Sequence, residues 1–249
     1  MQDIVFFSRD YFPGYGGVKN YTHNFYAGMK KIMPDVKLIA PQNPSGDPSI
    51  IISRIASKRK LGEHWGDNNH WISKINTYLH LKKVRGECRE EIRRSQLKGK
   101  HVIITALYDL ETLLFLEECL ALGVSYSIVF HGLDIIWQTS WYNSRWSLLF
   151  KRVTAGAEYF IFNSKATKNL FNEKVAIPKR GIILYPGINS AELLKYGKNA
   201  PDVNEKYNFS KDDLLIISIG ALVERKGFDL AIEAVSGIMQ SNPSLPVKY

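Results

Sequence analysis

Cysteine is scarce in this sequence, since only Cys88 and Cys119 occur among 249 residues. Two cysteines are too few for the disulfide framework of a small secreted scaffold, so the composition favours a reducing compartment such as the cytoplasm. We expect the pair to be ordinary structural residues, one a half-exposed thiol and the other a small buried apolar residue.

Long hydrophobic runs and an export signal are also missing. The first residues, MQDIVFFSRD, hold an acid at Asp3 and only a short apolar run before Arg9 and Asp10. The uncharged stretch in the middle of the chain, residues 119–133, is shorter than the ~18 residues that a membrane-spanning helix needs. We therefore expect a soluble or peripheral protein.

Signatures of metal and hydrolase chemistry are lacking as well. The six histidines show neither an H-x-x-x-H spacing nor a Cys/His cluster, and there is no G-x-S-x-G elbow and no Walker loop. We therefore predict neither a bound metal nor a cofactor.

Positive charge, by contrast, is in excess, because 33 Lys and Arg stand against 24 Asp and Glu, a formal charge of +9. One explanation is a solvated helix face interleaved with Glu87, Glu90 and Glu91. The other is an anionic membrane surface, where each basic side chain contributes about 1 kcal/mol. Nucleic acid is disfavoured, because no zinc-finger, RNA-recognition or helix-turn-helix pattern accompanies the charge. The clustered basic residues are Lys58, Arg59, Lys60, Lys82, Lys83, Arg85, Arg89, Arg93, Arg94, Lys98 and Lys100.

Short runs of apolar and β-branched residues alternate with amphipathic stretches along most of the chain. Strands that are continuously apolar and separated by helices imply a parallel sheet covered on both faces. We therefore predict an α/β fold with a Rossmann-like doubly wound sheet. The predicted strands are residues 4–8, 36–40, 49–53, 101–105, 125–130, 159–162, 181–185 and 214–220. One predicted helix face consists of Val18, Tyr21, Phe25, Met29 and Ile32.

Two irregular stretches interrupt this pattern. Residues 41–73 are rich in Pro, Gly and Asn and are interpreted as an extended insertion. Residues 186–213 are interpreted as a linker between a first domain, 1–185, and the start of a second, 214–249. We expect the second domain to be incomplete, because its strand and crossover helix leave sheet edges and a helix face uncovered. From the usual size of α/β domains, we expect the chain to be a piece of a longer one.

Ligands of doubly wound sheets bind beyond the carboxyl ends of the strands, and four loops lie there. The first carries Gly14, Gly16 and Gly17 before a helix, which suits a phosphate or sugar cradle or merely a tight turn. It is not a G-x-G-x-x-G fingerprint. The second reads HGLDI, in which His131 could donate to a substrate hydroxyl or an oxyanion, or be satisfied by backbone. Asp134 could orient that imidazole or bind a hydroxyl.

The other two loops also precede helices. In the third, which reads NSKATKNL, Asn163 or Ser164 is a good helix N-cap, and the same helix start could face a ligand. In the fourth, which reads GALVERKGFDLAIEAV, Arg225 and Lys226 precede Gly227 and a helix. Two cations beside a helix N-terminus suit a diphosphate, and a solvated basic turn is the alternative.

Taken together and in this order, these segments resemble glycosyltransferase family 4, the retaining sugar transferases of the two-domain GT-B fold. The matching segments span nearly the whole chain and are GYGGVKNY, HGLDI, FNSKATKNL, YPGINS and GALVERKGFDLAIEA. The resemblance implies a complete acceptor-side domain followed by the opening of the nucleotide-sugar-binding domain. It also implies a nucleoside-diphosphate sugar as the donor and no metal.

Carried over to this chain, the resemblance places Gly16 and Gly17 near the donor phosphates. It places His131 beside the transferred sugar, as the catalytic residue. We assign supporting roles on the acceptor side to Asp134 and Ser164.

In the second domain the resemblance places Lys226 on the donor diphosphate. Protein cations and helix N-termini would then stabilise the leaving diphosphate in place of a metal. Ala221 stands where the family usually has arginine, which weakens donor binding unless Arg225 reaches in. The family's E-x7-E segment, which holds the donor, would lie beyond residue 249, so we expect this chain by itself to transfer little or no sugar.

The acceptor is the least determined substrate. A stretch that combines aromatic and basic residues suggests a peripheral membrane face and a glycan or lipid-linked acceptor, with core packing of the tryptophans as the alternative. These residues are Trp137, Trp141, Trp146, Lys151 and Arg152.

Two other functions stay open. A truncated chain of this fold could bind an acceptor or a partner without catalysis, which predicts acceptor binding and no nucleotide binding. A nicotinamide-dependent Rossmann enzyme is the other, although no acid follows the predicted strand 36–40 and the dinucleotide fingerprint is absent.

Overall fold

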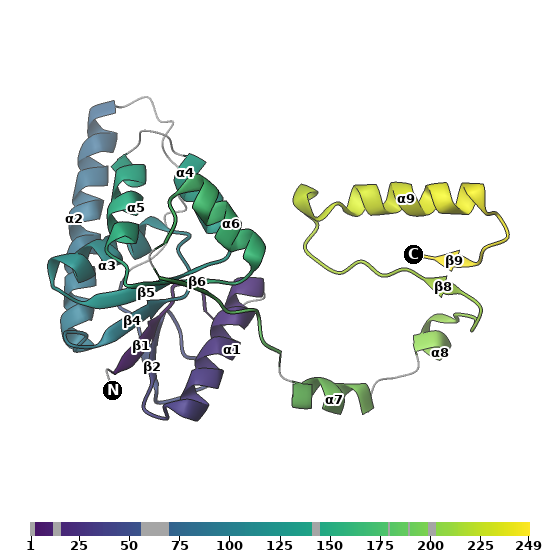
Figure 1. Cartoon of the computed structure of the whole chain (residues 1–249), viewed down its shortest axis with the longest axis horizontal. Coiled ribbons are helices and arrows are strands. Elements are labelled where there is room, and N and C mark those ends of the chain that lie inside the picture. Colours follow the sequence, from purple (N-terminus) through teal and green to yellow (C-terminus); the bar gives the residue numbers. More distant parts are fainter. Residues whose placement is uncertain are drawn as a thin grey trace. The chain divides into compact units, whose positions relative to one another are not determined.

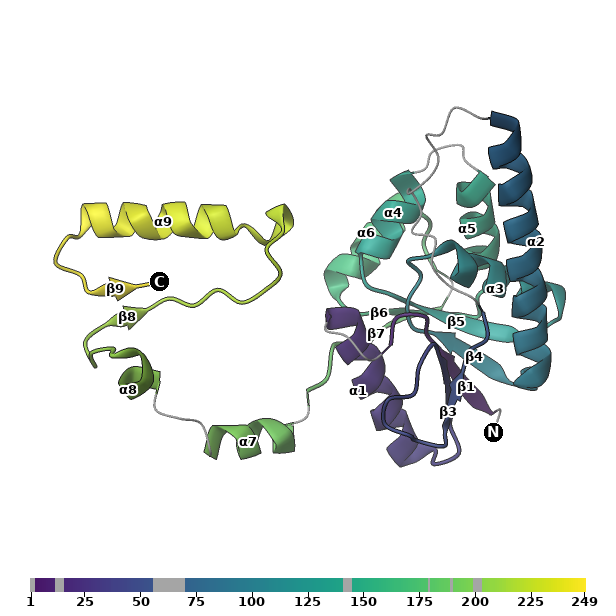
Figure 2. The same ribbon diagram turned by 180° about the vertical axis from the view of Figure 1, so that it is seen from behind.

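The computed structural model of the chain divides into two compact units, Met1–Ile188 (unit 1) and Asn189–Tyr249 (unit 2). Figures 1 and 2 show the elements of each unit from opposite sides. The structure describes residues 3–11, 16–55, 70–140, 145–178, 180–188, 190–198 and 203–249. The boundary between the units follows the last strand of the large sheet.

Unit 1 is built on one seven-stranded sheet in which every neighbouring pair of strands is parallel. The strand order is β3-β2-β1-β4-β5-β6-β7, so the order reverses between β1 and β4. This is the Rossmann-like doubly wound sheet that the alternating pattern predicted. The strands are β1 (Ile4–Phe7), β2 (Lys37–Ala40), β3 (Ile50–Ile52), β4 (His101–Ile104), β5 (Ser125–Phe130), β6 (Tyr159–Phe162) and β7 (Gly181–Ile183).

Helices α2 to α6 pack against one face of this sheet and α1 packs against the other (Figures 1 and 2). The strands are apolar on both faces for this reason: Phe7 of β1 joins the core under α2 to α6, and its neighbour Phe6 joins the core under α1. The helices are α1 (Gly17–Ile32), α2 (His70–Arg94), α3 (Leu110–Ala121), α4 (Leu133–Ser140), α5 (Arg145–Ala155) and α6 (Lys165–Lys174).

Two expectations about burial are wrong. Ile32, expected on one apolar face of α1 with Tyr21 and Phe25, is 77% exposed, because it is the last residue of the helix. Cys88 and Cys119 are both fully buried, so neither is a half-exposed thiol. They belong to α2 and α3, which pack against each other, and burial raises the pKa of both thiols.

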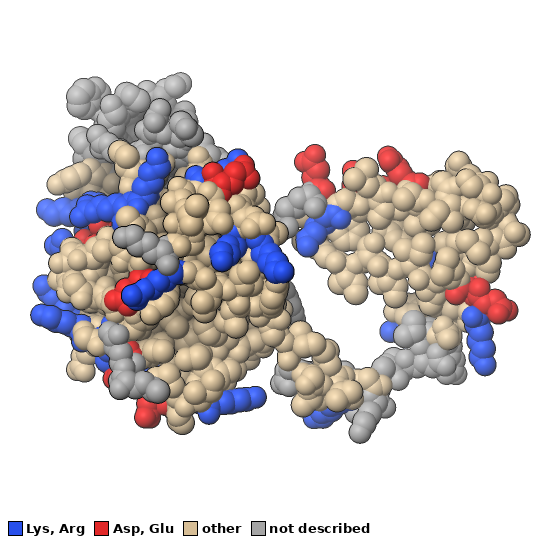
Figure 3. Space-filling view, viewed as in Figure 1, with Lys and Arg blue, Asp and Glu red and all other residues tan. Residues whose placement is uncertain are grey.

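Two basic residues of α2, Arg85 and Arg89, are paired with acids of α3. Arg85 of α2 and Arg152 of α5 both reach Glu117 of α3, at 2.7 and 3.4 Å, and Arg89 pairs with Glu118 one residue further along. Figure 3 shows Lys and Arg side chains gathered along the side of unit 1 on which α2 lies. These pairs favour the explanation of a solvated, ion-paired helix face for this part of the basic cluster, while residues 58–60 lie outside the described residues.

The three tryptophans expected at a membrane face differ in their surroundings. Trp146 of α5 packs against the core under α2 to α6, as the core-packing alternative requires. Trp137 of α4 is 51% exposed, and Trp141 lies outside the described residues. None of the described helices combines the length and the hydropathy that crossing a bilayer requires.

Unit 2 contains a two-stranded parallel sheet with a helix beside it. Strand β8 covers only Leu214–Leu215 of the expected strand 214–220 and pairs with β9 (Val247–Lys248). The stretch expected as a linker contains the helices α7 (Ser190–Lys198) and α8 (Val203–Tyr207). The 3-10 helix η1 (Glu224–Lys226) and the helix α9 (Phe228–Ser241) connect the two strands.

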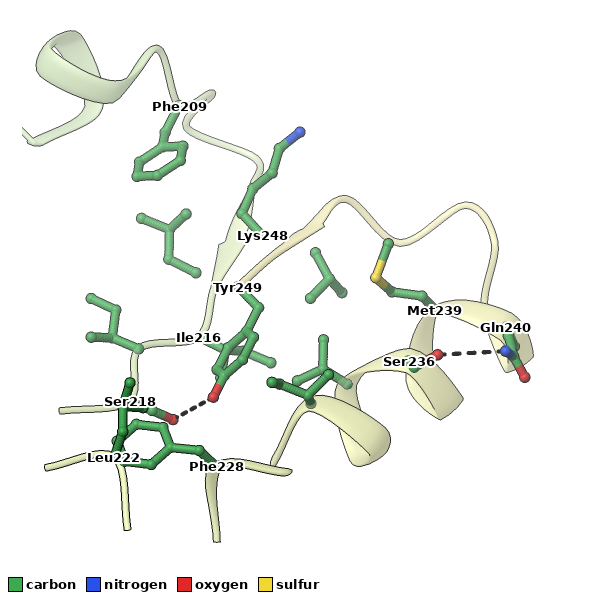
Figure 4. A pocket seen from close by; sticks show the side chains of 15 residues that line it. Phe209, Ile216, Ser218, Leu222, Phe228, Ser236, Met239, Gln240, Lys248 and Tyr249 are labelled. Carbon is green, nitrogen blue, oxygen red and sulfur yellow. Dashed lines mark hydrogen bonds between the residues drawn. The ribbon is translucent and has the colours of Figure 1, made fainter. Parts of the chain in front are cut away.

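The described part of unit 2 exposes most of its apolar side chains. Among its described hydrophobic residues, Val235 and Val247 are buried, whereas Ile219 and Leu222 are 92% and 86% exposed. An apolar hollow of about 1210 Å³ lies between α9 and the two strands. Figure 4 shows the side chains that line it, among which Tyr249 donates a hydrogen bond to Ser218. The helix and the strands of this unit thus meet without enclosing a full core.

Candidate functional site

The carboxyl ends of β1, β4, β5 and β6 meet at one edge of the sheet in unit 1, around the point where the strand order reverses. Open α/β sheets bind their ligands at such a point. The helices α1, α3, α4 and α6 all begin after these strands, so the partial positive charge of their N-termini collects at this edge. The edge therefore suits a ligand that carries negative charge.

His131 directly follows β5, and the loop after β4 holds its imidazole. Its Nε2 lies 2.8 Å from the carbonyl oxygen of Thr105. A carbonyl oxygen only accepts hydrogen bonds, so Nε2 carries the proton and Nδ1 has a lone pair. No described residue hydrogen-bonds Nδ1. The neutral ring thus presents an acceptor to a ligand, and not the donor that the sequence suggested.

Two tyrosines border the His131 ring. Tyr21 of α1 stands edge-on to it at 5.0 Å between ring centroids, and Tyr108 lies nearly parallel to it at 6.3 Å. Burial lowers the pKa of His131, although the hydrogen bond to Thr105 and the charge of Asp10 act in the opposite direction. The imidazole therefore stays neutral at pH 7.

Asp134 holds the backbone of the His131 loop, and not the imidazole as one expectation had it. Its carboxylate is fully buried and accepts hydrogen bonds of 2.8–3.1 Å from the backbone N–H groups of His131, Gly132 and Ile135. Burial raises the pKa of Asp134 to about 6, and these N–H groups lower it in part. Because it is buried and fully engaged, this carboxylate positions the loop and the start of α4.

Ser164 is a helix N-cap, which was the structural interpretation of its loop. Its Oγ accepts a hydrogen bond from the backbone N–H of Thr167 at 3.1 Å. The hydroxyl of Thr167 donates to Asn163 at 2.6 Å, and the side-chain amide of Asn163 donates to the carbonyl of His131 at 3.5 Å. This chain of hydrogen bonds ties the start of α6 to the His131 loop.

Helix α1 begins differently, because its N-cap is Gly16. No side chain caps this helix, and its first turn holds no acidic residue. The backbone N–H groups of Gly17, Val18 and Lys19 have no described hydrogen-bond partner. A Cβ atom added at Gly16 or Gly17 would meet nothing within 4 Å. The start of α1 is therefore both open and polar, as an anion-binding helix N-terminus must be.

Two charged residues that sequence reasoning did not assign to the site lie beside this helix start. Lys19 is in the first turn of α1, and its Nζ lies 3.4 Å from the carboxylate of Asp10, which follows β1. The charge of Asp10 also acts on His131 by raising its pKa. The sequence segment GYGGVKNY could have indicated Lys19, because this lysine falls within one helical turn of the glycines.

An ion pair between the buried Arg9 and the half-buried Asp109 supports the point where the strand order reverses. Arg9, just after β1, places Nε 3.1 Å from Asp109 and donates from Nη1 to the carbonyl of Ile55 at 3.2 Å. Asp109 also caps α3 by accepting from the N–H of Thr112 at 2.7 Å. The Arg9 side chain is only 8% exposed, so this pair fixes loops from three strands and does not face a ligand.

In unit 2, α9 also starts at a glycine without a side-chain cap. Gly227 has the left-handed φ of 63°, which glycine adopts without strain. Lys226 precedes it and is exposed, as is Ala221. The side chain of Arg225 lies outside the described part of the chain. Among the described residues of both units, no three His, Cys, Asp or Glu side chains gather as metal ligands would.

Comparisons with known proteins show the fold and no family. No protein-family model matches the chain, and no curated protein matches it. Sucrose-phosphate synthase from Thermosynechococcus elongatus matches 100% of this chain and 70% of its own, with a TM-score of 0.57 and 13% identity.

A second match is a Listeria monocytogenes protein described as a UDP-N-acetylglucosamine 2-epimerase. It matches 99% of this chain and 61% of its own, with a TM-score of 0.52 and 15% identity. The chain therefore spans 70% and 61% of the lengths of these two structures. These likenesses confirm the expected architecture: the chain has the Rossmann-like α/β organisation of GT-B proteins.

Proposed function

We propose that this protein is a glycosyltransferase that moves a sugar from a nucleoside-diphosphate sugar to an acceptor, with retention of configuration. The observation that carries the proposal is the uncapped start of α1, with Lys19 in its first turn, at the edge where His131 lies. The names of the two matched proteins, a sucrose-phosphate synthase and a UDP-N-acetylglucosamine 2-epimerase, support sugar chemistry on this fold.

Gly16 and Gly17 are proposed to face the donor diphosphate. Open N–H groups at a helix N-terminus bind anions because each donates a hydrogen bond and the helix dipole favours negative charge. The lack of side chains at both glycines lets phosphate oxygens approach the backbone. Lys19 adds a charge-assisted hydrogen bond when its ammonium group turns from Asp10 to a phosphate oxygen.

Negative charge grows on the diphosphate as its bond to the sugar breaks. Groups that donate to this charge stabilise the transition state more than the ground state, and they do so without a metal. In unit 2 we assign the same task to Lys226 and Arg225, and the uncapped start of α9 supports it. With Ala221 in place of the family's arginine, Arg225 would supply the second cation.

His131 is proposed to hold the transferred sugar. Because its Nε2–H is bonded to Thr105, the free Nδ1 accepts a hydrogen bond from a sugar hydroxyl. A neutral acceptor in a fixed orientation selects one pose of the sugar relative to the diphosphate. Asp134 acts through this residue by accepting from its backbone N–H, and Ser164 acts less directly, by capping the helix at whose start Asn163 donates to the carbonyl of His131.

The two alternative functions differ from this proposal in what they bind. A nicotinamide-dependent enzyme needs an acid after the second strand to hold a ribose, and here Ala40 and Pro41 stand at that position. A non-catalytic acceptor-binding module would share the fold and the aromatic residues around His131. It would not need the open helix start.

We also propose that unit 1 works at the cytoplasmic face of an anionic membrane, with a lipid-linked or envelope glycan as acceptor. Helix α5 exposes Leu148, and Lys151 follows one turn later on the same side; Arg152, next to Lys151, remains 63% exposed although it also reaches Glu117. Tyr78 and Leu79 of α2 are also exposed. Exposed apolar side chains flanked by cations are typical of helices that lie on anionic bilayers.

Nucleotide binding is the property that tests the transferase proposal. Saturation-transfer difference NMR detects ligands of millimolar affinity, so UDP, GDP, ADP, uridine and NAD can be screened against the chain. We expect a nucleoside diphosphate to bind, uridine not to bind, and inorganic pyrophosphate to displace the diphosphate. Binding of NAD alone would support the nicotinamide enzyme, and binding of no nucleotide would support the acceptor-binding module; either result contradicts the proposal.

A further inference from the structure

Tyr108 and Trp137 extend the aromatic surroundings of His131 to the protein surface. The Tyr108 ring lies nearly parallel to His131, at 26° and 6.3 Å, and Trp137 stands edge-on to Tyr108 at 72° and 5.7 Å. Trp137 is 51% exposed. The three rings therefore form a line of contacts that runs from the nitrogen proposed to hold a sugar out to solvent.

Buried hydrogen bonds hold the segments that carry these rings. Gln138, the neighbour of Trp137 in α4, is 7% exposed and donates from Nε2 to the carbonyl of Leu107 at 3.3 Å. Leu107 immediately precedes Tyr108, so this bond joins α4 to the loop after β4. The buried Asp134 fixes the start of the same helix. The rings are thus organised before any ligand arrives, which lowers the entropic cost of binding.

Trp137 is an exposed aromatic side chain, and burying its apolar ring surface under a ligand is favourable. A tryptophan buries roughly 150–250 Å² when it is enclosed, so a substantial area remains available here. The preceding residue of α4, Ile136, is 42% exposed, so a second apolar side chain of this helix reaches solvent. Exposed apolar patches at the edge of a site mark ligand or partner contacts more often than chance.

The chemistry of the aromatic rings favours a neutral ligand, and the charged side chain next to Tyr108 in the chain is already paired. This side chain, Asp109, pairs with Arg9. The face of an aromatic ring is negative and attracts the weakly positive C–H bonds of a ligand. A pyranose ring carries such C–H bonds on its faces and hydroxyls on its rim, and Nδ1 of His131 accepts from a hydroxyl.

We propose that Tyr108 and Trp137 form a subsite for a neutral pyranose ring of the acceptor, which stacks on the exposed face of Trp137. The proposal rests on the glycosyltransferase function, because transfer requires the acceptor to lie beside the donor sugar. It makes the acceptor a carbohydrate at this position. A lipid chain is the competing occupant, since exposed Trp and Ile side chains also enter bilayers.

The test follows the indole N–H signal of Trp137 in the ¹⁵N-labelled chain, assigned with the variant Trp137→Phe. Methyl pyranosides of glucose, galactose, mannose and N-acetylglucosamine are titrated separately, followed by bicelles of phosphatidylglycerol and phosphatidylcholine. The indole of Trp146, which packs against the core, is the matched control. We expect a saturable shift of Trp137 with at least one glycoside and no shift of Trp146. Tyr108→Ala is expected to lower the affinity for that glycoside about three- to tenfold.

Three outcomes would overturn the subsite: no saturable shift with any glycoside, equal shifts of both indoles, or a response to bicelles alone. The titration contains no nucleotide, so its result is separate from the test of nucleotide binding. Glycoside binding in a chain that binds no nucleotide would support the subsite and contradict the transferase. Nucleotide binding without a Trp137 shift would support the transferase and contradict the subsite.

Discussion

Helices α1 and α6 start at the same edge of the same sheet and begin in opposite ways. Ser164 satisfies an N–H group at the start of α6 with its own hydroxyl, whereas Gly16 leaves α1 without a side-chain cap. A capped start is complete by itself, and an open start retains hydrogen-bond donors for an anion. In the sequence, the glycine loop and the Asn-Ser pair each allowed a structural and a ligand-binding interpretation, and the structure shows which helix start is capped and which is open.

The largest expected effect comes from closing the open start. In Gly16→Asp a carboxylate at the N-cap accepts from the first-turn N–H groups and repels a phosphate. We expect the affinity for UDP to fall about ten- to a hundredfold. A fall of this size corresponds to the loss of roughly one charge-assisted hydrogen bond. Ligand-observed NMR titration measures this change.

Two controls separate the charge from other causes. Gly16 has a φ of 157°, which residues with side chains rarely adopt, so Gly16→Ala carries the same backbone strain without the carboxylate. Gly28→Asp adds the same charge at an exposed position of the same helix, where a Cβ meets nothing. Equal losses of affinity in Gly16→Asp and in either control would contradict the account.

The start of α4 is a third case, in which the buried carboxylate of Asp134 accepts hydrogen bonds from the backbone N–H groups. Asp134→Ala leaves three backbone N–H groups without their acceptor, so we expect a loss of about 1–3 kcal/mol in the free energy of unfolding. Asp134→Asn keeps one acceptor oxygen and should lose less. Urea denaturation measures the free energy of unfolding of both variants. Equal losses in the two would contradict a stabilising role for these hydrogen bonds.

The pH dependence of stability, compared between the wild type and Asp134→Asn, tests the role of the buried Asp134 carboxyl further. Burial raises the pKa of Asp134 from 3.8 to about 6, so the folded state favours the protonated form. The unfolded chain then binds fewer protons between about pH 4 and pH 6, and the stability of the wild type should fall relative to Asp134→Asn as the pH rises through that window. If the stability of the wild type relative to Asp134→Asn stays constant or rises between about pH 4 and pH 6, the raised pKa of Asp134 is refuted.

Removing the cap of α6 should have a smaller effect, confined to stability. Ser164→Ala loses one N-cap hydrogen bond, which costs about 1 kcal/mol of unfolding free energy. Ser164→Asp restores the cap and should restore the stability. We expect neither variant to change the affinity for UDP by more than twofold, and a loss comparable to that of Gly16→Asp would erase the distinction between the two helix starts.

The smallest effect concerns the protonation of His131. Burial lowers its pKa below the ordinary 6.5, so the ring should remain neutral when the pH falls through 6.5. The bond to Thr105 fixes the proton on Nε2. Nitrogen-detected NMR of the imidazole should show the Nε2–H tautomer at pH 7. A pKa above 6.5, or a proton on Nδ1, would mean that the ring donates to its ligand as the sequence had suggested.

The strands and the order of the loops could be predicted because they rest on local pattern. A continuous apolar run such as Ser125–Phe130 is a strand wherever its neighbours cover both faces, and the residue after it must lie at the carboxyl edge. His131 was found in this way. Its chemical role was not, because the role depends on which carbonyl faces Nε2, and that carbonyl belongs to Thr105 in the loop after another strand, β4.

The contacts that support the site were missed for the same reason. Arg9 and Asp109 are 100 residues apart, and nothing local to either marks the ion pair. Asp134 was correctly placed beside His131, but only the turn geometry shows that its carboxylate faces backbone N–H groups and not the ring. Helical spacing grouped Ile32 with the apolar face of α1, but Ile32 is the last residue of the helix and is exposed.

The most direct test of the central claim compares the two helix starts in one experiment. Backbone amide signals of the ¹⁵N-labelled chain are followed while UDP is added to millimolar concentration. We predict saturable shifts of Gly17, Val18 and Lys19 at the open start of α1, and no comparable shift of Thr167 at the capped start of α6. Equal shifts at both starts, or shifts at neither, would contradict the claim that the uncapped start of α1 is the diphosphate site.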